Sequence, residues 1–143
     1  MTDYFVVDNS VVMSWCFADE SNRYADVVLN RLTQATAVVP SIWPLEVVNV
    51  LLVAERQKRL SEADSMRFLT LLSQLPIHVE RAQPEKMMAQ LLALARTGNL
   101  SSYDASYLDL AMRKGFPLAT LDGKLIEAAR RIDVPILAIR PGE

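Results

Sequence analysis

Two aspartates of this 143-residue chain stand directly after short apolar runs. Asp8 follows residues 4–7, and Asp122 follows residues 118–121. In a parallel sheet the binding crevice lies outside the carboxyl ends of the strands, which is where both aspartates would stand if these runs are strands. Such an aspartate can hold a cation or act on a substrate, but it can equally cap the next helix or close a turn.

Glu46 and Asp104 lie in segments of helical character. Glu46 stands among aliphatic residues from 44 to 54, which predicts a helix buried on most sides, with Glu46 and Asn49 on one face. A buried carboxylate is costly unless a cation lies nearby, and a narrow solvated stripe or first-turn dipole pairing is the alternative. Asp104 has capping-box spacing from Ser101, so capping is its alternative role.

Together the four carboxylates predict a site for a hard divalent cation. Like charges about 4 Å apart repel by roughly 1 kcal/mol even in water, so a cluster persists when a cation occupies it or some groups stay protonated. All-oxygen ligands suit Mg²⁺ or Mn²⁺. His78 and Cys16 are the only histidine and cysteine, which argues against a conventional zinc site, and we assign His78 a structural or surface role on a strand.

Composition and charge argue against several classes of protein. The net charge of −2 and pI near 5.4 argue against a protein that coats nucleic acid nonspecifically. If the four carboxylates face a cation, however, 15 positive charges stand against 13 negative ones. The longest apolar stretch, 42–54, is too short and too polar to span a membrane, and the first residues do not resemble a signal peptide. We therefore expect one cytoplasmic domain over residues 1–143.

Alternation of short apolar runs and helical patterns predicts an α/β fold. We expect strands at residues 4–7, 37–39, 77–80, 118–121 and 136–139. We expect helices at residues 10–17, 20–34, 41–59, 61–74, 84–98, 101–115 and 124–132. Because helices of ten or more residues separate most strands, the strands should pair in parallel. The expected architecture is a three-layer α/β/α sandwich with a central, mostly parallel sheet.

Four segments in order make the sequence resemble a PIN domain, specifically the small VapC-type toxins. These segments are residues 6–12, 44–49, 103–108 and 119–122, and the resemblance extends to about residue 139. It implies a PIN-like fold and an endoribonuclease that depends on Mg²⁺ or Mn²⁺. It also implies that the catalytic, metal-binding residues are Asp8, Glu46, Asp104 and Asp122.

The resemblance further implies supporting residues and partners. Ser10, Asn49 and Thr120 match positions that often support the site through hydrogen bonds, whereas many relatives have a small residue where this chain has Asn9. An RNA substrate, a cognate antitoxin and a homodimer are the implied partners, and the apolar residues around 69–75 and 87–94 are the expected dimer helices. From the sequence itself, Lys124 is the best candidate for RNA contact, because it stands two residues after Asp122.

Other readings remain open. A domain with this fold and a catalytically weak site would be an RNA- or protein-binding module. A phosphoryl-transfer enzyme of another α/β family would also place Asp8 after the first strand. The acid–x–acid motif of haloacid-dehalogenase-like phosphatases is absent, because position 10 is serine, and no Walker-type loop occurs. A flap-endonuclease-type DNA nuclease would need larger clamp elements than this chain can hold.

Overall fold

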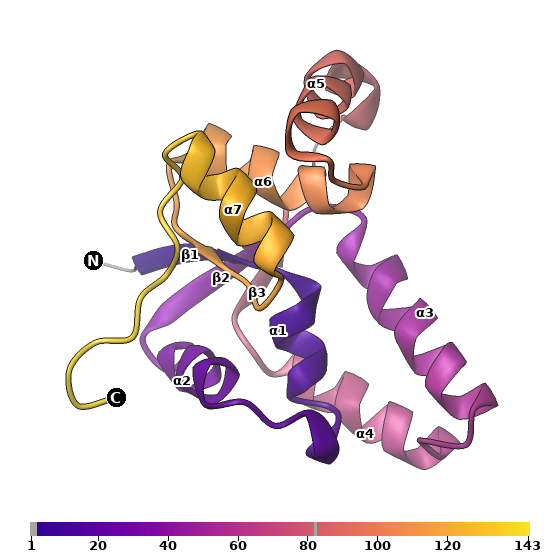
Figure 1. Cartoon of the computed structure of the whole chain (residues 1–143). Coiled ribbons are helices and arrows are strands. Elements are labelled where there is room, and N and C mark those ends of the chain that lie inside the picture. The colour runs from indigo at the N-terminus through magenta and orange to yellow at the C-terminus, as the bar shows by residue number, and fades with distance from the viewer. Residues whose placement is uncertain (1–2, 82) are drawn as a thin grey trace.

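A four-stranded parallel sheet forms the centre of the molecule (Figure 1). The computed structural model describes residues 3–81 and 83–143. The strand order is β3-β2-β1-β4, and the strands are β1 (Asp3–Val7), β2 (Ala35–Val39), β3 (Ile77–Val79) and β4 (Leu118–Ala119). Every pairing is parallel, as the sequence predicted. Along the chain, β2 and then β3 are added on one side of β1, whereas β4 is added on its other side. The direction in which strands are added therefore reverses between β1 and β4.

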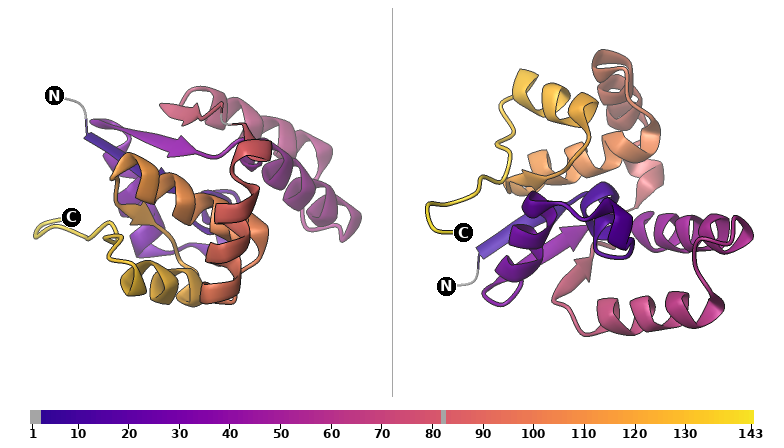
Figure 2. Two further views of the ribbon diagram at one scale, coloured as in Figure 1. Left: turned by 90° about the horizontal axis from the view of Figure 1, so that it is seen from above. Right: turned by 60° about the horizontal axis from the view of Figure 1, so that its bottom comes forward.

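Helices cover both faces of this sheet, which confirms the three-layer α/β/α prediction. They are α1 (Asn9–Ser14), α2 (Arg23–Arg31), α3 (Trp43–Arg56), α4 (Glu62–Ser73), α5 (Met88–Gly98), α6 (Ser102–Lys114) and α7 (Gly123–Arg131). Two 3₁₀ turns, η1 (Ala18–Glu20) and η2 (Pro84–Lys86), precede α2 and α5. In Figure 2, α6 and α7 lie on one side of the sheet, and α2 and α4 lie on the other. None of the helices in the described ranges is long and apolar enough to cross a membrane.

Several helix ends form as their sequences predict. Ser61 and Asp64 make a complete capping box at the start of α4. Gly115 ends α6 in the left-handed conformation, with φ of 69°. The helix expected from Ser41 instead begins at Trp43, and Ser41 does not cap it.

The core surrounds β1, whose residues Phe5, Val6 and Val7 are at most 2% exposed. Helix α3 was predicted to be buried on most sides, and this is wrong. One face packs into the core through Trp43, Val47, Leu51 and Ala54. The other face exposes Leu45, Val48, Leu52 and Val53 to solvent. Apolar content indicated burial, but the α3 face that points away from the sheet has no covering layer among the described residues.

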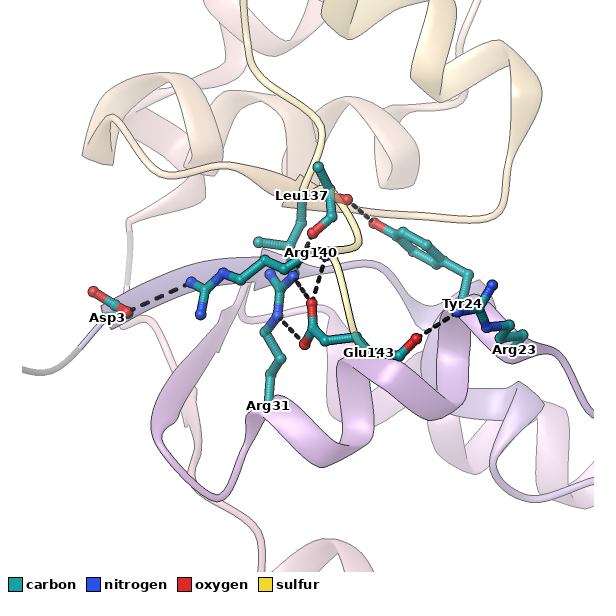
Figure 3. Close-up of polar contacts among 8 residues, drawn as sticks. Asp3, Arg23, Tyr24, Arg31, Leu137, Arg140 and Glu143 are labelled. Carbon is teal, nitrogen blue, oxygen red and sulfur yellow. Dashed lines mark hydrogen bonds and ion pairs between the residues drawn. The ribbon is translucent and has the colours of Figure 1, made fainter.

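The strand predicted at 136–139 does not form; Ile136 makes only an isolated bridge to Leu118. The backbone carbonyl groups that follow Ile136 accept hydrogen bonds from side chains of α2 instead (Figure 3). The Tyr24 hydroxyl donates to the Leu137 carbonyl at 2.6 Å, and the Arg31 guanidinium donates to that of Ala138. Because these carbonyl groups bond to α2, they do not pair with β4, and the segment does not continue as a strand of the sheet.

The same segment ends in an ion pair between the buried Arg31 and the partly exposed Glu143. Arg31 Nε donates to Glu143 Oε2 at 2.8 Å, and the Arg31 side chain is 8% exposed. The Arg140 backbone N–H also donates to Glu143 Oε1, at 2.6 Å. The bond from Arg31 and then that from Arg140 lower the pKa of Glu143 from 4.5 to about 2. This carboxylate therefore ties the last described residues to α2.

Glu143 should make the protein less stable in acid. A carboxylate with a lowered pKa stabilises the folded state above its unfolded pKa, and that contribution is lost as the pH falls from 4.5 towards about 2. We expect Glu143→Gln to unfold at lower urea concentration than the parent at pH 7, with the difference shrinking towards pH 2. The exposed Glu85→Gln is the control and should match the parent throughout. Equal midpoints for parent and Glu143→Gln at pH 7 would contradict this role of Glu143.

Candidate active site

The four acids predicted from the sequence line one cavity of about 500 Å³, which we call the acid cavity. Asp8 and Asp122 follow the neighbouring strands β1 and β4, so the sheet itself brings them to one edge. Glu46 comes from the first turn of α3 and Asp104 from the first turn of α6. The cavity thus lies outside the carboxyl ends of the strands, at the switch in topology.

Asp8 is the most buried of the four, at 4% exposed. Ser10 Oγ donates to its Oδ2 at 2.7 Å, and Thr120 Oγ1 donates to the same oxygen at 2.9 Å. Burial raises the pKa of Asp8, and the two hydroxyl bonds oppose that rise. Asp8 precedes α1, but its side chain makes no capping bond to it. The backbone N–H groups of Asn9 and Ser10 also lower the pKa of Asp8, but the two hydroxyl bonds to Asp8 are the stronger contacts.

Ser10 and Thr120 also hold the loop after β4. The backbone N–H of Leu121 donates to Ser10 Oγ at 3.0 Å, and that of Asp122 donates to Thr120 Oγ1 at 3.0 Å. Each hydroxyl thus accepts one bond from the loop and donates one to Asp8. The two residues connect the ends of β1 and β4 around a single carboxylate oxygen.

Glu46 is held by a tyrosine from another helix. The hydroxyl of Tyr107, in α6, donates to Glu46 Oε1 at 2.5 Å, and Tyr107 itself is fully buried. Burial is the main cause that raises the pKa of Glu46; the bond from Tyr107 lowers it, and the charges of Asp8 and Asp104 raise it further. Glu46 therefore lies within electrostatic reach of two other acids, and its position depends on the packing of α3 against α6.

Asp104 and Asp122 differ in how they are held. Ser101 caps α6 by accepting from the Asp104 backbone N–H at 3.1 Å, but the reciprocal bond of a capping box is absent from the described bonds. Burial, then the charges of Asp8 and Asp122, raise the pKa of Asp104. Asp122 does cap α7: its Oδ1 accepts from the backbone N–H groups of Lys124 and Leu125, at 2.9 and 3.4 Å. Capping therefore occupies one carboxylate oxygen of Asp122, whereas the Ser101 side chain is the capping contact near the Asp104 carboxylate and lowers its pKa.

The carboxylate groups of the acid cavity are chemically suited to bind a hard cation. Four carboxylates offer only oxygen, and mutual repulsion is among the causes that raise the pKa values of Glu46 and Asp104. Yet residues 3–81 and 83–143 contain no group of three or more acidic, histidine or cysteine side chains already arranged to hold a metal ion. Glu46 is turned to Tyr107 and Asp122 to α7, so binding would require these side chains to reorient.

Not every predicted residue lines the acid cavity. Asn49 lines a neighbouring cavity together with Glu46. The Lys124 side chain is exposed, and Lys124 is not among the residues that line the acid cavity. The basic residue that does line it is Arg59, whose guanidinium lies 4.3 Å from the Phe17 ring centroid.

Sequence reasoning did not assign site roles to Arg59, Asn9 or Tyr107. Arg59 follows Lys58, whose left-handed backbone (φ 61°) turns the chain after α3, and no local pattern indicates where that turn leads. Asn9 is adjacent to Asp8, and this position in the sequence could have indicated that Asn9 lines the site. Tyr107 lies within a motif segment, but its partner is 61 residues away.

The chain was compared with known proteins by sequence and by structure. A family model described as PIN domain matches residues 5–131. The crystal structure of PAE2754 from Pyrobaculum aerophilum matches with a TM-score of 0.68 and 24% identity, over 90% of this chain and 87% of that one. FitAcB from Neisseria gonorrhoeae matches with a TM-score of 0.63 and 18% identity, over 94% of this chain and 96% of that one. At these identities the two structures show a shared fold. The search of curated proteins found no match.

Removing the most buried charge should stabilise the metal-free protein. Because the pKa of Asp8 is raised in the folded state, wild-type stability should fall as the pH rises above 3.8, the ordinary pKa of an aspartate. We expect Asp8→Asn to gain on the order of 1 kcal/mol at pH 7 in chelator, and to show a weaker fall in stability between pH 3.8 and pH 7. Urea unfolding at the two pH values measures both effects. The exposed Asp26→Asn, outside the cavity, is the matched control. A loss of stability in Asp8→Asn would show that the buried charge is compensated within the fold.

Proposed function

Because this chain belongs to the PIN-domain family, we propose that it is an endoribonuclease that uses Mg²⁺ or Mn²⁺ in the acid cavity. PIN domains are typically metal-dependent nucleases, which supports a nuclease in general. The observation that carries the proposal is the convergence of Asp8, Glu46, Asp104 and Asp122 on one cavity. Their oxygens are ligands that these cations prefer, and a cation would relieve the repulsion among them.

The side chains of the cavity suggest separate roles in hydrolysis. A bound divalent cation would polarise the scissile phosphate and lower the pKa of a water molecule. Asp8, held by Ser10 and Thr120, is the most rigidly placed ligand. Glu46 has a raised pKa and only one oxygen bonded to Tyr107, so its other oxygen can orient the attacking water and accept its proton.

The products follow from in-line attack. The water oxygen bonds to phosphorus as the bond from phosphorus to the 3′-oxygen breaks, which leaves a 5′-phosphate and a 3′-hydroxyl. The ribose 2′-hydroxyl takes no part, so preference for RNA must come from substrate fit. Arg59, the basic residue at the cavity, pairs with the exposed Asp19 and Glu20 at 3.5 and 3.3 Å, and we expect a backbone phosphate to replace these partners. We assign it this role beside the Lys124 contact predicted from the sequence.

We further propose that the protein is the cytoplasmic toxin of a toxin–antitoxin pair and forms a homodimer. Apolar side chains on α4 and α5 support a protein interface, since Leu71, Met88 and Leu92 are 38%, 66% and 51% exposed. An antitoxin segment could enter the acid cavity with a basic side chain against the carboxylates. The binding-module alternative is favoured by one observation, the lack of a preformed metal group among the described residues.

Cleavage of a single-stranded RNA tests the proposal. We expect hydrolysis with Mn²⁺ or Mg²⁺, none in chelator, and a loss of at least about 100-fold in rate for Glu46→Gln and Asp8→Asn, because a neutral amide is a poor ligand for a hard cation. Glu85→Gln and Asp26→Asn, both exposed and outside the cavity, are matched controls and should retain the rate. RNA binding without hydrolysis under any of these conditions would favour the binding-module alternative.

Light scattering tests the dimer. We expect a particle of about twice the 16.0 kDa chain mass at tens of micromolar protein, an estimate from ordinary dimer affinities. Leu92→Glu should shift the protein to monomer, because a charge in an apolar interface is costly to bury. Thr33→Glu, exposed and outside α4 and α5, is the control for added charge. A monomeric parent at this concentration would reject the homodimer and leave the nuclease proposal intact.

A further inference from the structure

A second cavity opens beside the acid cavity and shares Asn9, Glu46 and Val50 with it. Its volume is about 380 Å³, within the usual range for sites that hold small organic groups. Ile42 and Leu45 add apolar walls, and Asn49 and Tyr103 add polar and aromatic ones. We call it the amide cavity, after Asn9 and Asn49. Whatever occupies it lies next to the four carboxylates.

Asn9 has an unmet hydrogen-bonding requirement. The residue is 8% exposed, and its Oδ1 is buried with no hydrogen-bond partner within the described part of the chain. A buried carbonyl without a partner is costly, and most such groups in native proteins are bonded. The terminal torsion of asparagine is broad, so the amide can turn towards an arriving group. Asn9 therefore offers an amide, both donor and acceptor, at the junction of the two cavities.

Tyr103 supplies an aromatic surface to the same cavity. It precedes Asp104 in the first turn of α6 and is 55% exposed. Unpaired RNA bases are commonly recognised by stacking on an aromatic ring together with hydrogen bonds to the base edge. Apolar walls, an aromatic ring and an amide without a bond partner form that combination.

We propose that the amide cavity holds one unpaired nucleobase of the RNA, adjacent to the scissile phosphate. Tyr103 stacks on the base, and the Asn9 amide bonds to its edge. This inference rests on the proposed nuclease function for its biological meaning, but the base subsite can be measured without cleavage.

A nucleobase fits these walls better than the other candidates do. A cation would favour the carboxylates of the acid cavity over aliphatic walls. An aliphatic side chain from a protein partner would fill the space but leave Asn9 Oδ1 without a donor. A nucleobase presents a flat face to Tyr103 and donors and acceptors to Asn9, and thus meets both requirements.

Neutral nucleosides test the subsite without phosphate, metal or cleavage. In the metal-free protein, millimolar adenosine, cytidine, guanosine or uridine should shift the Asn9 side-chain amide resonance, whereas ribose alone should not. Tyr103→Leu should weaken nucleoside binding by roughly tenfold, because stacking is lost, and Tyr103→Phe should retain it. Tyr4→Leu removes another exposed tyrosine, one that stacks on Phe116 and lines neither cavity, and is the matched control.

Cleavage provides the second readout. An RNA that lacks the base next to the scissile bond should lose roughly tenfold in kcat/KM with the parent. The loss should be smaller with Tyr103→Leu, which removes the stacking ring, and with Asn9→Leu, which keeps side-chain size but not the amide. No shift by any nucleoside, or an equal shift by ribose, would overturn the subsite while RNA cleavage could still stand. An aliphatic peptide that shifts the Asn9 resonance when nucleosides do not would assign the cavity to a protein partner. Nucleoside binding without RNA cleavage would support the subsite and reject the nuclease.

Discussion

The burial of several carboxylates together in one cavity is the constraint on which the rest of the site depends. Asp8 lies almost wholly out of water, and burial, followed by the charges of other acids, raises the pKa values of Glu46 and Asp104. A fold seldom keeps such a cluster unless a positive partner or a proton compensates it. The arrangement is therefore costly for the metal-free protein, and the proposed cation would offset that cost. The proposed chemistry uses this uncompensated negative charge to bind the cation.

Hydroxyl groups hold the acids in place without neutralising them. Ser10 and Thr120 converge on one oxygen of Asp8, and Tyr107 reaches one oxygen of Glu46. In each case the other carboxylate oxygen makes no side-chain bond among those described. A lysine or arginine in these places would pair with the acids and compete with a cation. The neutral donors instead preserve the charge of each carboxylate, and Glu46 can still turn from Tyr107 towards a cation.

Local patterns predicted the strands and most helices well, because apolar runs and capping signals are short-range. Residues 136–139 were mispredicted because α2 takes the carbonyls of that segment, and no local signal reports this competition. The exposure of α3 was missed because apolar composition does not reveal which face has a covering layer. The four acids could be chosen by their places at strand and helix ends. The bond from Tyr107 to Glu46 could not, since it depends on how α3 and α6 pack.

The pairing of β1 with β4 makes the site a late product of synthesis. Asp8 leaves the ribosome early, whereas Thr120, which bonds to it, follows 112 residues later. Contacts so distant along the chain form only after the intervening segment has folded or collapsed. A growing chain that ends before β4 lacks Asp122 and one of the two hydroxyl bonds to Asp8. The complete four-acid cavity therefore cannot form until β4 and the loop that carries Asp122 have been translated.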